Sequence, residues 1–231
     1  MIAGGMDRTA PAPPPRGLRL APRDLDVLRF AVRHGMVLAD QLSNRFLTGP
    51  VPAQRRLRAL EVAGLLVRDR VLAALPAVVR ATPRGARLAG CDLAPASLDL
   101  ARVHHNLALV DLSEELLVTH PGSAWTTERE LRRDRMRAAR TGGAWERQRR
   151  VPDGLLRLDG GERVAVELDL TPKRSARLDL LAGAYAVDRD VDTVWWYLPS
   201  QVAVSRLSAL VAARGLEHLI EPRAWRSRRG F

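Results

Sequence analysis

Apolar residues along this chain change spacing repeatedly, from the three-and-four step of a helix to the two-residue step of a strand. Both kinds of segment recur along the chain, and their order predicts an α+β protein. The segments expected to be helical are 23–35, 38–46, 52–64, 98–118, 127–139, 171–185 and 201–214. The segments expected to be strands are 65–68, 77–82, 145–151, 153–158, 163–170 and 191–198.

Three short helices followed by a β-hairpin, over residues 23–90, are the order of a winged helix-turn-helix. The third helix is then the recognition helix. Its face away from Leu57 and Leu60 is polar, and Arg68 and Arg70 would lie near the tip of the wing. The side chains expected on the polar face of this helix are Gln54, Arg55, Arg56 and Arg58.

Basic residues outnumber acidic ones by 37 to 26, a formal net charge of +11, which favours a polyanionic partner. The excess is concentrated in 23–90 and 123–150. An arginine-rich helix face can simply be solvated, but the acids of the first region, mainly Asp24, Asp26 and Asp40, lie away from the third helix. One-sided charge of this kind predicts contact with double-stranded DNA.

Other classes of protein are excluded by what the sequence lacks. The longest apolar run, 71–79, is broken by Pro76 and is too short for a membrane span. The proline-rich residues 1–22 contain no apolar signal core and predict a disordered arm. With Cys91 as the only cysteine, we expect a cytoplasmic protein without disulfides or a thiolate zinc site. No phosphate-binding loop, Ser/His/Asp series or HExxH motif is present.

Three carboxylates are predicted to meet on the second half of the chain. Side-chain alternation places Glu167 and Asp169 on one face of a strand, and the turn at 159–161 brings Asp153 beside them. Pro-Asp-Gly is also a common turn, and acids can line a solvated edge strand. In a covered sheet, however, unpaired carboxylates are costly, which favours a bound Mg²⁺ or Mn²⁺ held by Asp153, Glu167 and Asp169.

Two further residues are candidates for this centre. Lys173 is the only lysine among the 37 basic residues and begins a helix, where a cation is disfavoured. It is either a surface lysine or a group that polarises an attacking water. Glu128 is a possible fourth acidic group, whereas Glu130 fits a capping box with Thr127.

These residues resemble the PD-(D/E)XK, or restriction-endonuclease-like, superfamily, whose core order is αβββαβ. The matching segments are Val151-Pro152-Asp153-Gly154 and Glu167-Leu168-Asp169. The family has lysine where this chain has Asp169, so Lys173 would be a migrated lysine. Over residues 23–215 the layout also resembles the replication-relaxation proteins of actinobacterial plasmids and integrative elements. The segments carrying that likeness are Arg102–Leu107, Trp125–Leu131, PDG, ELD and VWWYLP.

The resemblance implies DNA binding in plasmid replication, mobilisation or relaxation, with other replication or mobilisation proteins as candidate partners. With Asp153, Glu167, Asp169 and Lys173 as catalytic residues, the chain would nick or cleave DNA with Mg²⁺. The alternative is a catalytically inactive DNA-binding regulator that keeps the nuclease fold as a scaffold, which the Glu-x-Asp departure favours.

The expected organisation follows from these segments. It comprises an arm at 1–22, a winged helix at 23–90, a connecting helix at 91–122, a restriction-endonuclease-like domain at 123–220 and a basic tail at 221–231.

Overall fold

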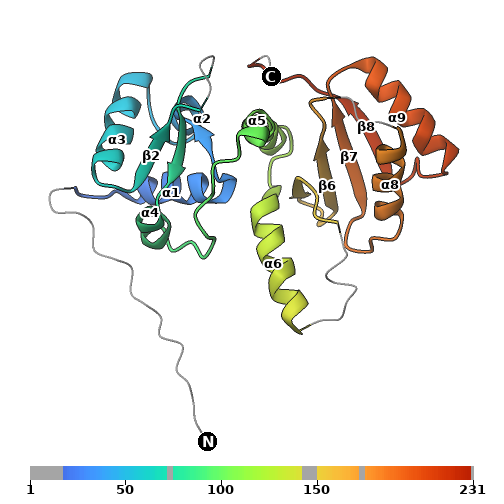
Figure 1. Ribbon diagram of the computed structural model, residues 1–231, viewed down its shortest axis with the longest axis horizontal. Coiled ribbons are helices and arrows are strands. Elements are labelled where there is room, and N and C mark those ends of the chain that lie inside the picture. Colours follow the sequence, from blue (N-terminus) through green and yellow to red (C-terminus); the bar gives the residue numbers. More distant parts are fainter. Residues whose placement is uncertain (1–17, 72–74, 142–149, 172–174, 230–231) are drawn as a thin grey trace, which may run out of the picture. The chain divides into compact units, whose positions relative to one another are not determined.

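The chain folds into two units, residues 1–98 and 99–231, each with its own β-sheet. The computed structural model describes residues 18–71, 75–141, 150–171 and 175–229. Helices and strands occur in both units, so the predicted α+β class is confirmed (Figure 1). Within the described ranges, every helix is too short or too polar to cross a membrane.

The first unit combines helices with a three-stranded antiparallel sheet. Its elements are α1 (Pro22–His34), β1 (Val37–Leu38), α2 (Ala39–Phe46), α3 (Pro50–Val62), β2 (Leu66–Asp69), β3 (Val78–Ala81) and α4 (Pro83–Leu88). The strand order is β1-β3-β2, with Val67 opposite Arg80. Prolines at the first positions of α1 and α3 suit a helix start, because the missing N–H has no partner there anyway.

Apolar residues at helical spacing form the core of this unit. Leu28 and Ala31 of α1 and Leu57 and Leu60 of α3 are all buried, and Val79 of the central strand β3 is fully covered. The buried stripe of α3 fixes which of its side chains face outward.

The second unit is built on a five-stranded sheet of order β4-β5-β6-β7-β8. β4, β5 and β6 are antiparallel, whereas β6, β7 and β8 are parallel and are joined by helical crossovers. The elements are η1 (Leu100–Arg102), α5 (Val103–Thr119), β4 (Ala124–Thr127), α6 (Glu128–Thr141), β5 (Gly154–Arg157), β6 (Arg163–Leu168), α8 (Ser175–Ala186), β7 (Thr193–Leu198), α9 (Gln201–Ala213) and β8 (Ile220–Ala224).

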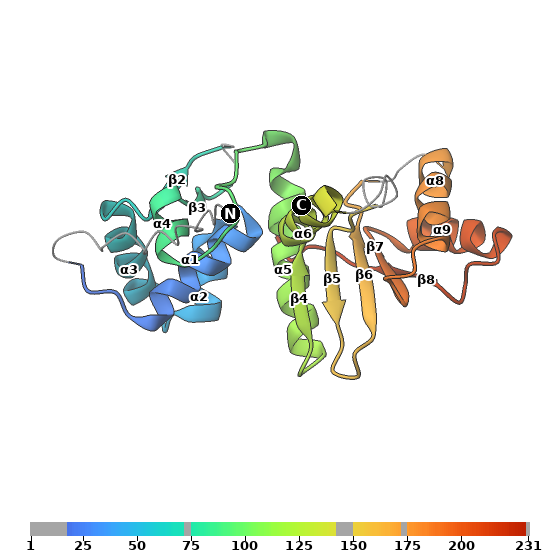
Figure 2. The same ribbon diagram turned by 90° about the horizontal axis from the view of Figure 1, so that it is seen from below.

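Both faces of this sheet are covered, as the view in Figure 2 shows. Val164, Val166 and Leu168 pack with α5 on one face, whereas Ala165 packs with α8 and α9 on the other. Alternation along β6 therefore turns Glu167 toward α8 and α9, in a covered position where a carboxylate needs partners.

The first strand of this sheet differs from the prediction. Most of the strand expected at 145–151 lies outside the described residues, and Arg150 and Val151 have no regular secondary structure. β4 pairs with β5 instead, and α6 is inserted between them. β4 is four residues long and ends in two threonines, so alternation was too brief to reveal it.

The end of the chain also differs from the prediction. The expected basic tail begins as a strand, because β8 pairs in parallel with β7. A proline in the middle of β8 hides its strand pattern. The predicted connecting helix belongs to the second unit, where α5 contributes Leu112 and Leu116 to the core. Residues 1–17 of the predicted arm lie outside the described residues.

Candidate functional site

Asp153 lies directly before β5, where it is held by two other elements. Its Oδ2 accepts a 2.9 Å hydrogen bond from the backbone N–H of Leu168 at the end of β6. Its Oδ1 lies 3.2 Å from Nε2 of His105 on α5 and 3.9 Å from the Arg102 guanidinium. Burial lowers the pKa of His105, but the adjacent Asp153 carboxylate outweighs burial and raises the pKa above its usual value.

Glu128, the first residue of α6, joins this group through a shared arginine. Its Oε2 accepts a 2.9 Å hydrogen bond from Arg102, and its Oε1 accepts one of 3.0 Å from Arg132, one turn further along α6. Arg102 therefore lies between the carboxylates of Glu128 and Asp153. The Thr127–Glu130 capping box predicted beside it is confirmed, with Thr127 N–H donating to Glu130 Oε2 at 2.9 Å.

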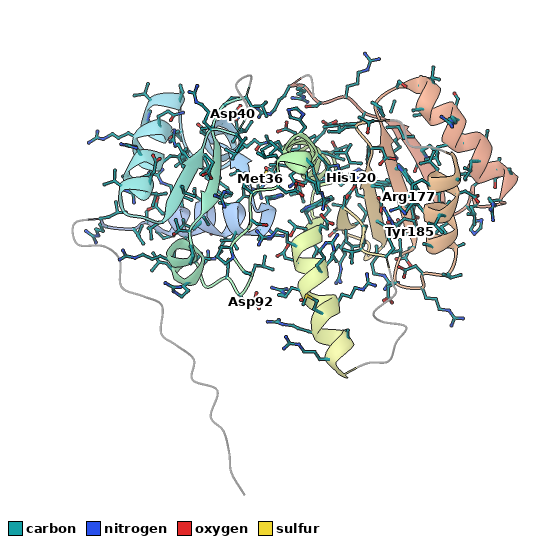
Figure 3. The ribbon with its side chains drawn as sticks, in the orientation of Figure 1. Met36, Asp40, Asp92, His120, Arg177 and Tyr185 are labelled. Atoms are coloured by element: carbon teal, nitrogen blue, oxygen red, sulfur yellow. The ribbon has the colours of Figure 1, made fainter. Side chains whose placement is uncertain are left out.

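Glu167, in the penultimate position of β6, is the most buried carboxylate of the group, with 1% of its surface exposed. Arg150 donates to both carboxylate oxygens, at 3.0 Å from Nε to Oε1, and the Tyr185 hydroxyl of α8 donates to Oε1. Burial and the negative charge of Asp153 raise the pKa of Glu167 to about 7, although Arg150 and Tyr185 oppose that rise. Figure 3 labels Tyr185 on α8, beside the sheet.

Asp169 follows β6 directly and is 3% exposed. It accepts a 3.1 Å hydrogen bond from the indole N–H of Trp196 on β7, and its own N–H donates to the Tyr197 carbonyl at 2.9 Å. The sequence predicts that Asp169 and Glu167 share one face of the strand. In the structure the side chain of Asp169 contacts the Trp196 side chain. Lys173, the other predicted member, lies outside the described residues.

The carboxylates were tested for their fit to Mg²⁺. This ion needs several carboxylate oxygens turned toward one point. The oxygens of Asp153, Glu128 and Glu167 are instead engaged by donors from the protein, and the described ranges contain no group of three or more His, Cys, Asp or Glu side chains placed to hold a metal. In this arrangement the residues do not fit a resident Mg²⁺.

Sequence reasoning missed the partners that neutralise the cluster, namely Arg102, His105, Arg150 and Tyr185. In the sequence, His105 lies within the segment Arg102–Leu107 and Tyr185 ends the expected helix 171–185, with nothing to link either to a carboxylate. These groups stand up to 51 positions from the carboxylate they contact, as Arg102 does from Asp153, and no local pattern connects them. The one available signal was that a covered strand carrying Glu167 requires a cation nearby.

The first unit carries a second candidate surface, on α3. Gln54, Arg55 and Arg58 are exposed, and 70% of the Arg58 side chain is accessible to solvent. Gln54 accepts a 3.2 Å hydrogen bond from Arg68 of β2, which ties the helix to the sheet. Arg70 is exposed just beyond β2.

Arg56 has a different environment from its neighbours on α3. Its Nε donates a 2.8 Å hydrogen bond to Asp24 of α1, whose side chain is completely buried. A second donor of the same guanidinium bonds the Arg19 carbonyl at 2.8 Å. Arg56 is therefore anchored to α1. Of the arginines predicted on the outward face of α3, Arg55 and Arg58 are exposed there, whereas Arg56 is only partly exposed.

Comparison with known proteins gave no match to a family model, a curated protein or a solved structure.

Proposed function

We propose that this chain binds double-stranded DNA through its first unit, with α3 as the recognition helix of a winged helix. The observation that carries the proposal is the outward face of α3, where Gln54, Arg55 and Arg58 are exposed opposite a buried stripe. A helix presented in this way can enter the major groove, where arginine recognises guanine and phosphate. Helix order, the antiparallel sheet and the net charge of +11 support the same reading.

The test measures the affinity of the full chain for a random DNA duplex as salt is varied. The double variant Arg55→Gln/Arg58→Gln should bind more weakly and reduce the slope of log K against log salt by about 2, one unit per lost phosphate contact. Arg87→Gln, an exposed arginine of α4, controls for charge alone. Unchanged affinity and slope in the double variant would overturn the proposal.

For the second unit, we propose a restriction-endonuclease-like module that acts without catalysis. The series α5, β4, β5, β6, α8, β7 follows the αβββαβ order, with α6 inserted after the first strand. Asp153 and Glu167 occupy the positions of the family's acidic residues. Their pairing with His105, Arg102 and Arg150 supports a scaffold role, in the plasmid or mobile-element setting that the sequence resemblance implies.

DNA cleavage is the second candidate function, favoured by the grouping of Glu128, Asp153 and Glu167 from three separate elements. Supercoiled plasmid should be incubated with the protein in Mg²⁺, Mn²⁺ or EDTA. Nicking that requires metal and is lost in both Asp153→Ala and Lys173→Ala would establish cleavage. Plasmid that is retarded but intact with every metal would support the regulator.

A further inference from the structure

The second unit contains a cavity of about 350 Å³ between α6 and α8, and every charged side chain that lines it within the described residues is an arginine. Arg132 and Arg135 come from α6, Arg177 from α8, and Arg150 from the segment before β5. The remaining lining residues are apolar, namely Val151, Leu180, Leu181 and Ala184.

Two of these arginines are positioned by the carboxylate cluster. Arg150 is fixed by Glu167 and lies 5.7 Å from the centre of the Tyr185 ring, and Arg132 is paired with Glu128. Neither of these two acids is among the described residues that line the cavity. Arg135 and Arg177 bring two further positive charges to the same space. Four guanidinium groups that line one space offer several N–H donors to an anion, although the charges of Arg132 and Arg150 are offset by their carboxylate partners.

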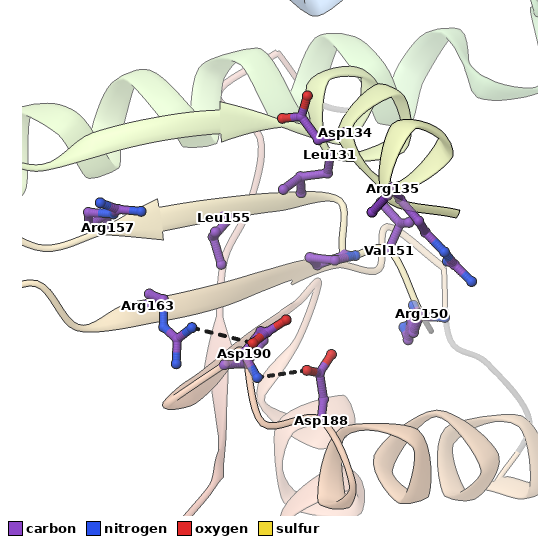
Figure 4. A pocket seen from close by; sticks show the side chains of 13 residues that line it. Leu131, Asp134, Arg135, Arg150, Val151, Leu155, Arg157, Arg163, Asp188 and Asp190 are labelled. Atoms are coloured by element: carbon purple, nitrogen blue, oxygen red, sulfur yellow. Dashed lines mark hydrogen bonds and ion pairs between the residues drawn. The ribbon is translucent and has the colours of Figure 1, made fainter. Parts of the chain in front are cut away.

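A neighbouring cavity, of about 510 Å³, differs from the smaller one in the charges of its lining. The two share Arg135, Arg150 and Val151, so they adjoin. Figure 4 shows the larger one, with these three residues labelled among its lining. The larger cavity contains acids as well as arginines, and Arg163 lies 3.7 Å from Asp190. Its arginines therefore have acids beside them in the same cavity. Among the residues that the structure describes, the charged side chains lining the smaller cavity are all arginines.

We infer that the arginine cavity between α6 and α8 binds a phosphate group of a nucleic-acid backbone, as a contact separate from α3. The planar guanidinium fork matches phosphate in a bidentate geometry. The cavity is shallow and open to solvent, which suits a backbone phosphate that remains attached to a longer chain. This inference deepens the proposed DNA binding and rests on it for the choice of polymer over a free anion.

The experiment compares four full-length proteins for binding to a random duplex: wild type, Arg55→Gln/Arg58→Gln, Arg135→Gln/Arg177→Gln, and the combination of all four substitutions. Arg132 and Arg150 are left in place because they neutralise buried acids. The cavity variant should lose affinity on the order of tenfold near 0.1 M salt and reduce the salt slope by about 1, for the loss of one phosphate contact. The combined variant should lose both contributions.

The matched control is Arg137→Gln/Arg206→Gln, which removes the same charge from α6 and α9 outside the cavity. Affinity of the cavity variant equal to this control would overturn the inference. If the cavity variant loses affinity for DNA while the α3 variant binds as tightly as wild type, the α3 proposal is wrong and the phosphate contact in the cavity is still supported.

Inorganic phosphate at constant ionic strength distinguishes the two sources of the anion. In the supported case, phosphate competes weakly with DNA on wild type and has no effect on the cavity variant. If inorganic phosphate binds wild type tightly while DNA affinity is the same in the cavity variant and its control, the cavity is a small-anion site and the nucleic-acid assignment is wrong. Thermal unfolding followed by circular dichroism checks that each variant is folded.

Discussion

Glu167 is a carboxylate in a covered position of a sheet, and its neighbours determine its protonation. Arg150 and Tyr185 favour its ionised form, whereas burial and Asp153 favour its neutral form. The second pair prevails, so the group titrates near neutral pH inside the folded protein and near pH 4.5 in an unfolded chain. Folding is thereby coupled to proton uptake by this single side chain.

The coupling predicts how stability changes with pH. Between pH 4.5 and about 7 the folded protein binds a proton at Glu167 that the unfolded chain has released, so the free energy of unfolding falls as pH rises. From the shift of that pKa, the Glu167 contribution lost by pH 8 is about 3 kcal/mol. His105, whose pKa is also raised, acts in the same direction.

Urea unfolding of wild type and Glu167→Gln across pH 5 to 8 isolates this contribution. The variant keeps His105 but has no titrating group at 167. The free energy of unfolding of wild type should therefore fall relative to that of Glu167→Gln as pH rises. Parallel stability curves would show that Glu167 is ionised throughout and that Arg150 outweighs burial.

Residue types in the cluster were readable from the sequence, but their partners were not. Strand alternation and the hairpin turn brought Asp153 and Glu167 to neighbouring strands, as predicted, because those rules operate within a few residues. The arginines that neutralise them come from other elements through tertiary packing. The predicted metal site thus rests on the carboxylates alone, whereas the ion pairs around them depend on residues distant in the sequence.

At the scale of elements, the pairing of β4 with β5 depends on a glycine. A Cβ built on Gly154 would lie 2.0 Å from Cζ2 of Trp125. Trp125 is 6% exposed and packs into the core on the α5 face. The glycine of the Pro-Asp-Gly segment thus makes room for a tryptophan from the neighbouring strand.

Gly154→Ala should consequently destabilise the second unit by about 1–3 kcal/mol, the usual cost of overpacking, because the ring and both strands must shift. Gly160→Ala in the following turn is the matched control, since nothing lies within 4 Å of a Cβ there. Chemical denaturation of both variants gives the comparison. Equal stability would mean that Trp125 has room to move.

Elements with strong periodicity were predicted well, as were the short strands β2, β3 and β5, but other short elements were not. α6 and β7 lie within two residues of the predicted ends, as their apolar pattern or cap required. β1, β4 and β8 were missed, being two to five residues long, and their assignment depends on a partner strand rather than on their own sequence.

At the scale of the whole molecule, the division at Leu98 and Asp99 predicts that the second unit folds on its own. Its sheet has a separate apolar cluster on each face, and Asp99 caps the first turn that follows it by accepting a 3.1 Å hydrogen bond from the Ala101 N–H. A fragment of residues 99–231 should show native-like circular dichroism and cooperative thermal unfolding. A fragment without a cooperative transition would contradict this independence.

The backbone of the edge strand β8 determines whether a further strand can pair with this sheet. The Leu219 carbonyl accepts a hydrogen bond from the Val194 N–H, and the Trp225 N–H donates one to the Leu198 carbonyl. The backbone N–H and C=O groups of odd-numbered residues along β8 therefore point toward β7. Pro222, an even-numbered residue, turns its backbone to the open edge, where proline has no N–H to donate. A strand from another molecule would find its ladder interrupted there. The sheet thus ends at an edge that resists aggregation through strand addition.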